Sequence, residues 1–113
     1  MENLIMEDLI MAFNEIEQYV NQVEQIFFYG PFSEDTVRQD LQLRESMDIR
    51  SGRRTNNLGE KQNVYISDIN VALGTINKMI GATHIHRGDT TFLSKCERCQ
   101  NQLNKLLDIV RSF

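Results

Sequence analysis

The stretch that decides the fold is His84–Phe113, with the sequence HIHRGDTTFLSKCERCQNQLNKLLDIVRSF. Apolar residues and cysteines recur in it at alternating intervals of four and three: Phe92, Cys96, Cys99, Leu103, Leu106, Val110 and Phe113. This heptad spacing is typical of a helix that buries one stripe against partner helices, as in a coiled coil. The same stretch contains a His-x-His pair and a Cys-x-x-Cys pair, which support a competing interpretation as a metal site.

A zinc site would combine His84 and His86 with Cys96 and Cys99, because two imidazoles and two thiolates suit tetrahedral zinc. The two cysteines, however, fall in register with five other residues of the heptad row. A free cysteine often behaves as a small buried hydrophobic residue. The spacing also lacks a second pair of cysteines or a more typical histidine pair. The sequence therefore favours core cysteines, and zinc ligation stays as an alternative.

A second heptad row runs through residues 4–29, and it consists of Met6, Leu9, Phe13, Ile16, Val20, Val23 and Phe27. Gly30 and Pro31 follow at once, and both residues are typical of the end of a helix. A long first helix is therefore expected.

Two shorter helices are expected between the long ones. The first begins at Ser33, and the second buries Ile69 and Ile76. Between these helices lies a stretch without periodic apolar residues but with two glycines, which predicts a loop, with a short hairpin as the less favoured alternative. The sequence thus predicts helices over about 4–29, 33–48, 67–80 and 90–112, and a loop over 50–62.

These elements predict one all-α domain over residues 1–113, a small four-helix bundle with long first and last helices. Short first and third connections would give it an up-down-up-down topology. The shorter helices leave parts of the two long heptad rows uncovered, so we expect a homodimer or higher oligomer that associates through these rows.

The composition is that of an ordinary globular chain, with 113 residues, 41% of them hydrophobic and 25% charged. No apolar run approaches the roughly 20 residues of a membrane span, and no export signal precedes the first helix. The two cysteines therefore predict reduced thiols and a cytoplasmic protein without a membrane partner.

The net charge of −4 is unevenly distributed along the chain. Residues 1–37 contain eight acidic residues and neither Lys nor Arg, so all 12 basic residues follow them. One interpretation is an acidic surface that disfavours duplex nucleic acid and attracts a basic partner. The other is the solvated outer face of an amphipathic helix.

Two basic loops are candidates for holding an anion such as a nucleotide-like phosphorylated molecule. The first supplies Arg50, Arg53, Arg54 and Lys61, and the second supplies His84, His86, Arg87 and Thr90 beside the start of the last helix. In an up-down bundle the two loops lie at opposite ends of one subunit, so only a dimer would bring them together. No cofactor is expected.

No nucleophile elbow, Walker loop, dinucleotide fingerprint or zincin helix is present, so the sequence predicts no enzyme. The favoured function is non-enzymatic binding of a partner protein, as an adaptor, chaperone-like factor or inhibitor. The candidate anchor is an aromatic cluster of Phe27, Phe28, Tyr29 and Phe32. The alternatives are sequestration of the phosphorylated molecule at a subunit interface and a zinc-stabilised regulatory protein.

Overall fold

The computed structural model describes residue 15, residues 17–82 and residues 90–113, and these residues form helices without any β-strand. Residues 17–24 are α-helical and lead directly into a π-helix. The elements that follow the first α-helical residues are η1 (Gln25–Tyr29), α2 (Glu34–Arg50), α3 (Asn57–Ala82) and α4 (Thr90–Ser112). The predicted all-α class is confirmed. Most of the predicted first helix, over residues 4–14 and 16, lies outside the described residues.

Helix α3 differs most from the prediction, because it begins at Asn57 rather than near residue 67 and is the longest of the described elements, with 26 residues. The predicted loop over 50–62 is therefore wrong in its second half, and so is the alternative hairpin. The actual connection, residues 51–56, is short and is called the α2–α3 corner below.

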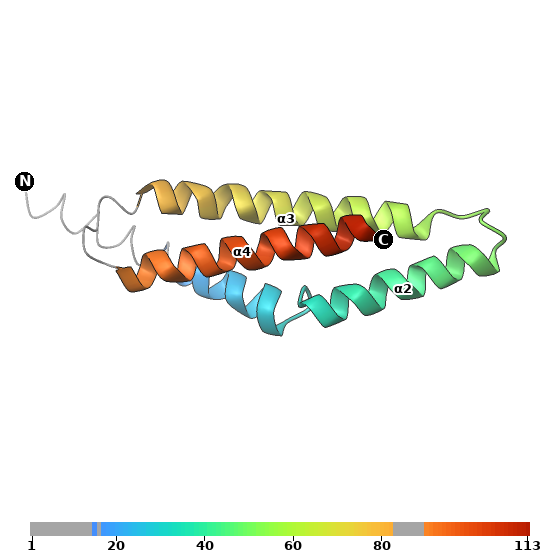
Figure 1. The fold of residues 1–113 in the computed structure, drawn as a ribbon, viewed down its shortest axis with the longest axis horizontal. Coiled ribbons are helices and arrows are strands. Elements are labelled where there is room, and N and C mark those ends of the chain that lie inside the picture. The colour runs from blue at the N-terminus through green and yellow to red at the C-terminus, as the bar shows by residue number, and fades with distance from the viewer. Residues whose placement is uncertain (1–14, 16, 83–89) are drawn as a thin grey trace, which may run out of the picture.

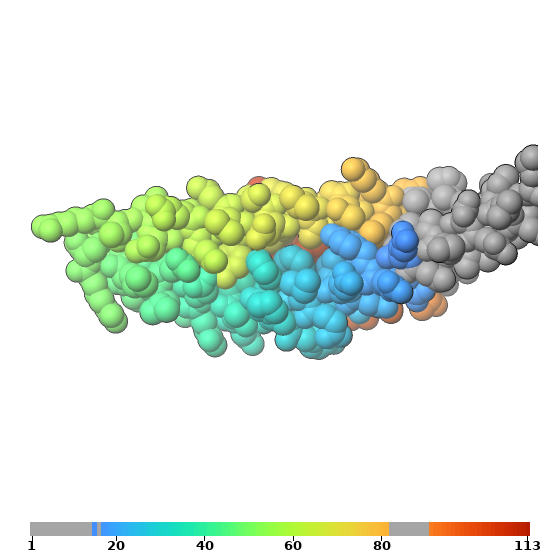
Figure 2. All heavy atoms as spheres, turned by 180° about the vertical axis from the view of Figure 1, so that it is seen from behind, coloured from blue at the N-terminus to red at the C-terminus, as the bar shows by residue number. Residues whose placement is uncertain are grey.

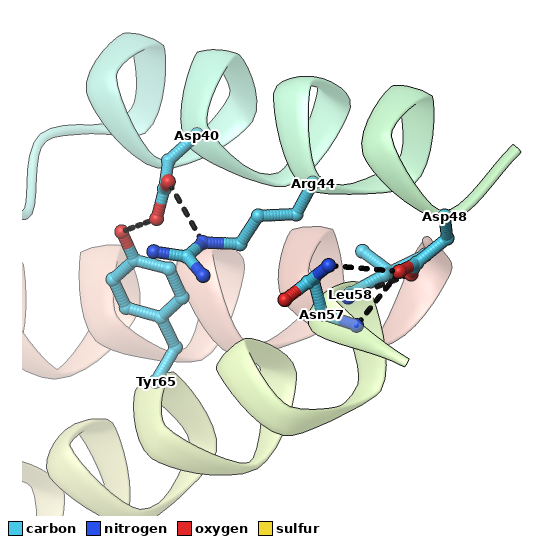
Figure 3. A network of polar contacts seen from close by, with 6 residues as sticks. All are labelled: Asp40, Arg44, Asp48, Asn57, Leu58 and Tyr65. Carbon is cyan, nitrogen blue, oxygen red and sulfur yellow. Dashed lines mark hydrogen bonds and ion pairs between the residues drawn. The ribbon is translucent and has the colours of Figure 1, made fainter. Parts of the chain in front are cut away.

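The early start of α3 is explained by hydrogen bonds that its first amides donate to a residue of the preceding helix (Figure 3). The buried Asp48 carboxylate accepts the backbone N–H of Asn57 at 2.8 Å and that of Leu58 at 2.9 Å. The side chain of Asn56 accepts the N–H of Gly59 at 3.2 Å. These bonds satisfy amides that have no partner inside the helix, so α3 extends ten residues further than its obvious apolar pattern.

The helices form three rows rather than an up-down-up-down bundle (Figure 1). Residues 17–29 and α2 run end to end in the same direction, α3 returns beside them, and α4 packs against both. From behind, α3 and the row made by residues 17–50 cover most of α4 (Figure 2). The predicted topology is therefore wrong, because the first connection bends the chain without reversing it.

Gly30 permits this bend. The N–H of Phe32 donates to the carbonyl of Ile26 at 3.0 Å, which folds the chain tightly over the end of η1. A Cβ atom at Gly30 would lie 2.5 Å from the carbonyl oxygen of Gln25, so any larger residue would have to displace the backbone.

The core lies between the three rows and contains the apolar stripe of α4. Six of the seven residues predicted for that stripe are buried, and these are Phe92, Cys96, Cys99, Leu103, Leu106 and Val110. They pack with buried residues of the other helices, among them Val20, Val37, Leu41, Ile69 and Ile76. The stripe of α4 is thus covered within one chain and does not require a second copy. Oligomerisation through the heptad rows stays a prediction.

Candidate functional site

The predicted aromatic cluster at the end of η1 is divided between the core and the surface. Phe27 is buried, and its ring lies 5.2 Å from that of Phe32, which in turn meets the ring of Tyr65 edge-on at 5.6 Å. Phe28 is half-buried, whereas Tyr29 is 75% exposed. Phe27 therefore closes one part of the core, Phe28 and Phe32 are both half-buried, and Tyr29 is the most exposed of the four.

Phe28 and Tyr29 line one end of a groove that runs along α4. The hollow beside them has a volume of about 470 Å³ and is completed by Arg98, Asn101, Gln102 and Lys105. A second hollow of about 350 Å³ adjoins it at Arg98 and is lined by Thr91, Ser94 and Lys95 as well. These nine residues define what we call the α4 groove.

The α4 groove exists because one helix presents two different stripes. Its buried stripe follows the heptad row described above, while the groove residues of α4 recur every three or four positions on another side of the helix. Residues at such intervals share one face. The groove is thus a continuous surface along about four turns of α4, with η1 as its aromatic wall.

The α4 groove is positively charged in a chain that is negatively charged. Among its described lining residues are three cations, Lys95, Arg98 and Lys105, and no acidic side chain. Since the whole chain carries −4, all other residues together carry −7. The groove therefore attracts anionic groups against the overall charge of the protein.

Two of the three groove cations bind the neighbouring row, while the third has no hydrogen bond or ion pair within the described part of the chain. Lys95 Nζ donates to Asn21 Oδ1 at 2.9 Å, and Lys105 Nζ lies 3.2 Å from Glu34 Oε2. The hydrogen bond from Lys105 is the main reason why the pKa of Glu34 is lowered. Arg98 has its guanidinium carbon 6.0 Å from the centroid of the Phe28 ring and forms no ion pair with any described residue.

The first predicted anion site lies at the α2–α3 corner, where Arg50, Arg53 and Arg54 are exposed. Arg53 has a left-handed backbone with φ of 62°, directly after Gly52 at 69°. The helix N-terminus beside these arginines is already occupied, since Asp48 and Asn56 accept its first amides. The corner thus offers guanidinium groups but lacks the free amides that usually complete an anion site.

Lys61, the fourth residue of this set, lies apart from the arginines, with its Nζ 5.1 Å from the centroid of the Tyr65 ring. Of the second predicted set, His84, His86 and Arg87 lie outside the described residues, and Thr90 is the first residue of α4. The 26 residues of α3 span about 39 Å at 1.5 Å per residue, so the corner arginines and Thr90 lie at opposite ends of the bundle (Figure 1).

Both cysteines are fully buried and free, as expected for core residues. Burial raises the pKa of the Cys96 thiol and of the Cys99 thiol to about 11, so both stay protonated near neutral pH. Within residues 17–82 and 90–113 no group of three or more His, Cys, Asp or Glu side chains is placed to hold a metal ion. The two histidines of the zinc alternative lie outside this part of the chain.

Comparison with models of protein families, with curated proteins and with solved structures finds no match to this chain. Among the described residues no helix combines the length and apolar content that crossing a bilayer requires. The α4 groove is therefore the candidate functional site among the described residues. Sequence reasoning found its aromatic wall but missed the four residues of α4 that face it: Arg98, Asn101, Gln102 and Lys105.

Proposed function

We propose that this protein is a non-enzymatic binding protein that recognises a segment of a partner protein through the α4 groove, as an adaptor or inhibitor does. The observation that carries the proposal is Tyr29, a large aromatic side chain left 75% exposed beside a hollow of about 470 Å³. Tyrosine and arginine are the residues that most often dominate the binding energy of protein interfaces. Tyr29 and Arg98 lie together in this groove.

The rigidity of the groove walls supports this proposal. Tyr29 belongs to a π-helix, an uncommon element that is frequent at functional sites. The tight bend at Gly30 and the packing of Phe27 against Phe32 hold this π-helix in place. A preorganised wall lowers the entropy that binding would otherwise cost.

The chemistry of the lining residues favours binding over catalysis. The described lining residues supply aromatic rings, hydroxyls, side-chain amides and cations, and none of them has a carboxylate, imidazole or thiol that would serve as a general base or nucleophile. Amides and hydroxyls are adaptable hydrogen-bond partners for a polypeptide surface. A protein surface matches this mixture of aromatic and polar contacts.

Site-specific photo-crosslinking in the native host tests the proposal. A benzophenone amino acid replaces Tyr29 in one variant and Val71 in another, because Val71 is comparably exposed, at 67%, but lies on α3. We expect a discrete protein adduct from position 29 that is absent from position 71. Adding Arg98→Glu to the position-29 variant should weaken that adduct.

The matched pair makes the result decisive. Identical adducts from both positions, or none from position 29, would contradict recognition through the α4 groove. Far-UV circular dichroism of each variant verifies that the helices are intact.

A further inference from the structure

The charges of the α4 groove identify the kind of segment that it binds. We propose that the occupant is a helix of the partner protein that carries two carboxylates seven residues apart, with an apolar side chain between them. This inference rests on the proposed function above and specifies its partner.

Acidic side chains are indicated by the cations of the groove, since among the described residues only Lys105 is paired with a carboxylate. Arg98 lies over the ring of Phe28, which orients its guanidinium group and leaves its N–H donors without a carboxylate among the described residues. A planar guanidinium group binds a carboxylate through two parallel hydrogen bonds. Lys105 already contacts Glu34, but its ammonium group has three donors and its side chain is 61% exposed. Both residues are thus able to donate hydrogen bonds to a carboxylate of a partner.

A helix suits the groove better than an extended segment because of backbone hydrogen bonding. An extended peptide needs partners for its own N–H and C=O groups, which the edge of a sheet supplies. The groove walls are helices, whose backbone groups are bonded within each helix, and only Asn101 and Gln102 offer side-chain amides. A helix satisfies its own backbone and presents only side chains. The elongated shape along α4 fits such an occupant.

The spacing of the cations sets the spacing of the carboxylates. Arg98 and Lys105 are two helical turns apart, which corresponds to about 10.5 Å along α4. A helix lying along α4 therefore matches them with acidic residues at i and i+7. A residue at i+3 or i+4 lies on the same face, and an apolar side chain there enters the hollow lined by Phe28 and Tyr29.

Fluorescence anisotropy with designed peptides tests the inference. One labelled alanine-based peptide of about 18 residues, long enough to form a helix, carries glutamates at i and i+7 and leucine at i+4. Its isomer has the same composition but glutamates at i and i+5, which point to different sides. We expect the 113-residue chain to bind the first peptide about fivefold more tightly than the isomer.

A charge exchange shows whether Arg98 makes the contact. Arg98→Glu should weaken binding of the i, i+7 peptide, and replacing its first glutamate by lysine should restore it. The matched control is Arg54→Glu, which makes the same charge change at the exposed α2–α3 corner and should leave the affinity unchanged. Melting temperatures verify that each variant is folded.

The possible outcomes separate this inference from the proposed function. Equal affinity for the two isomers, or no peptide binding, overturns the acidic helix, while the crosslink at position 29 still tests partner binding independently. Loss of both the peptide binding and the crosslink overturns both proposals. An oligothymidylate that binds more tightly than either peptide, and needs Tyr29 to do so, would overturn the acidic helix in favour of single-stranded nucleic acid, since aromatic rings with cations also bind bases.

Discussion

Gly74 lies in the interior of α3, where alanine should make the protein more stable. It is exposed, and a Cβ atom added there would meet nothing within 4 Å. Glycine within a helix costs about 0.5–1 kcal/mol relative to alanine, because its backbone loses more conformational freedom on folding. We expect Gly74→Ala to raise the free energy of unfolding by this amount. For a chain of this size the melting temperature should then rise by about 2–4 °C.

Urea denaturation followed by far-UV circular dichroism measures the change, and Gly30→Ala is the matched control. At Gly30 a Cβ atom would lie 2.5 Å from the carbonyl oxygen of Gln25 and 3.1 Å from that of Ile26. The same substitution should therefore lower the free energy of unfolding there, by about 1–3 kcal/mol as in other overpacked sites. A destabilised Gly74→Ala, or two changes of the same sign, would refute the reasoning from local space.

Three further measurements test the core and the polar network. The pKa of the Asp48 carboxyl group is lowered in the folded protein, first because the carboxylate accepts the N–H of Leu58. The resulting stabilisation is present above pH 3.8, the usual pKa of this group, and is lost as the pH falls through the lower pKa of the folded state. As the pH is lowered below about 4, the free energy of unfolding should thus decrease in the wild type and decrease less steeply in Asp48→Asn. Parallel pH profiles of the two proteins would contradict this. Leu103 is fully buried, and Leu103→Ala should cost about 3–5 kcal/mol in urea denaturation, so a cost below about 1 kcal/mol would argue against the packing. Because burial raises the pKa of Cys96 and Cys99 to about 11, a disulfide reagent should label them slowly at neutral pH and rapidly in denaturant. Rapid labelling of the folded protein would show that the thiols are accessible.

The helices whose apolar spacing is uninterrupted could be predicted from the sequence. The stripe of α4 is such a case, and α2 begins and ends within two residues of its predicted bounds. The start of α3 was missed because its stripe includes a polar residue. Leu58 and Tyr65 continue the spacing of the predicted helix toward its N-terminus, but Gln62 stands between them. Its side chain is half-buried and donates to the carbonyl of Val110 at 2.9 Å, a role that no local pattern indicates.

The topology and the site could not be predicted, because both depend on how distant parts of the chain pack together, which the sequence pattern does not show. Gly30 and Pro31 correctly predicted the end of a helix, but they do not say whether the chain then reverses. For the same reason nothing in the spacing of Arg98 and Lys105 distinguishes them from the ordinary solvated charges of an amphipathic helix. Only the packing of residues 17–29 against α4 brings Phe28 and Tyr29 beside them and turns these charges into one wall of a groove.

The hydrogen bonds that join the helices differ greatly in the length of chain that they enclose. Asp48 reaches Asn57 and Leu58 across nine and ten residues, whereas Lys95 reaches Asn21 across 74 residues. Closing a short loop costs less entropy and is faster than closing a long one. We therefore expect the α2–α3 corner to assemble early in folding and residues 17–29 to dock on α4 last. The proposed binding surface of the α4 groove then forms only when folding is complete, so that a partner would recognise only the fully folded protein.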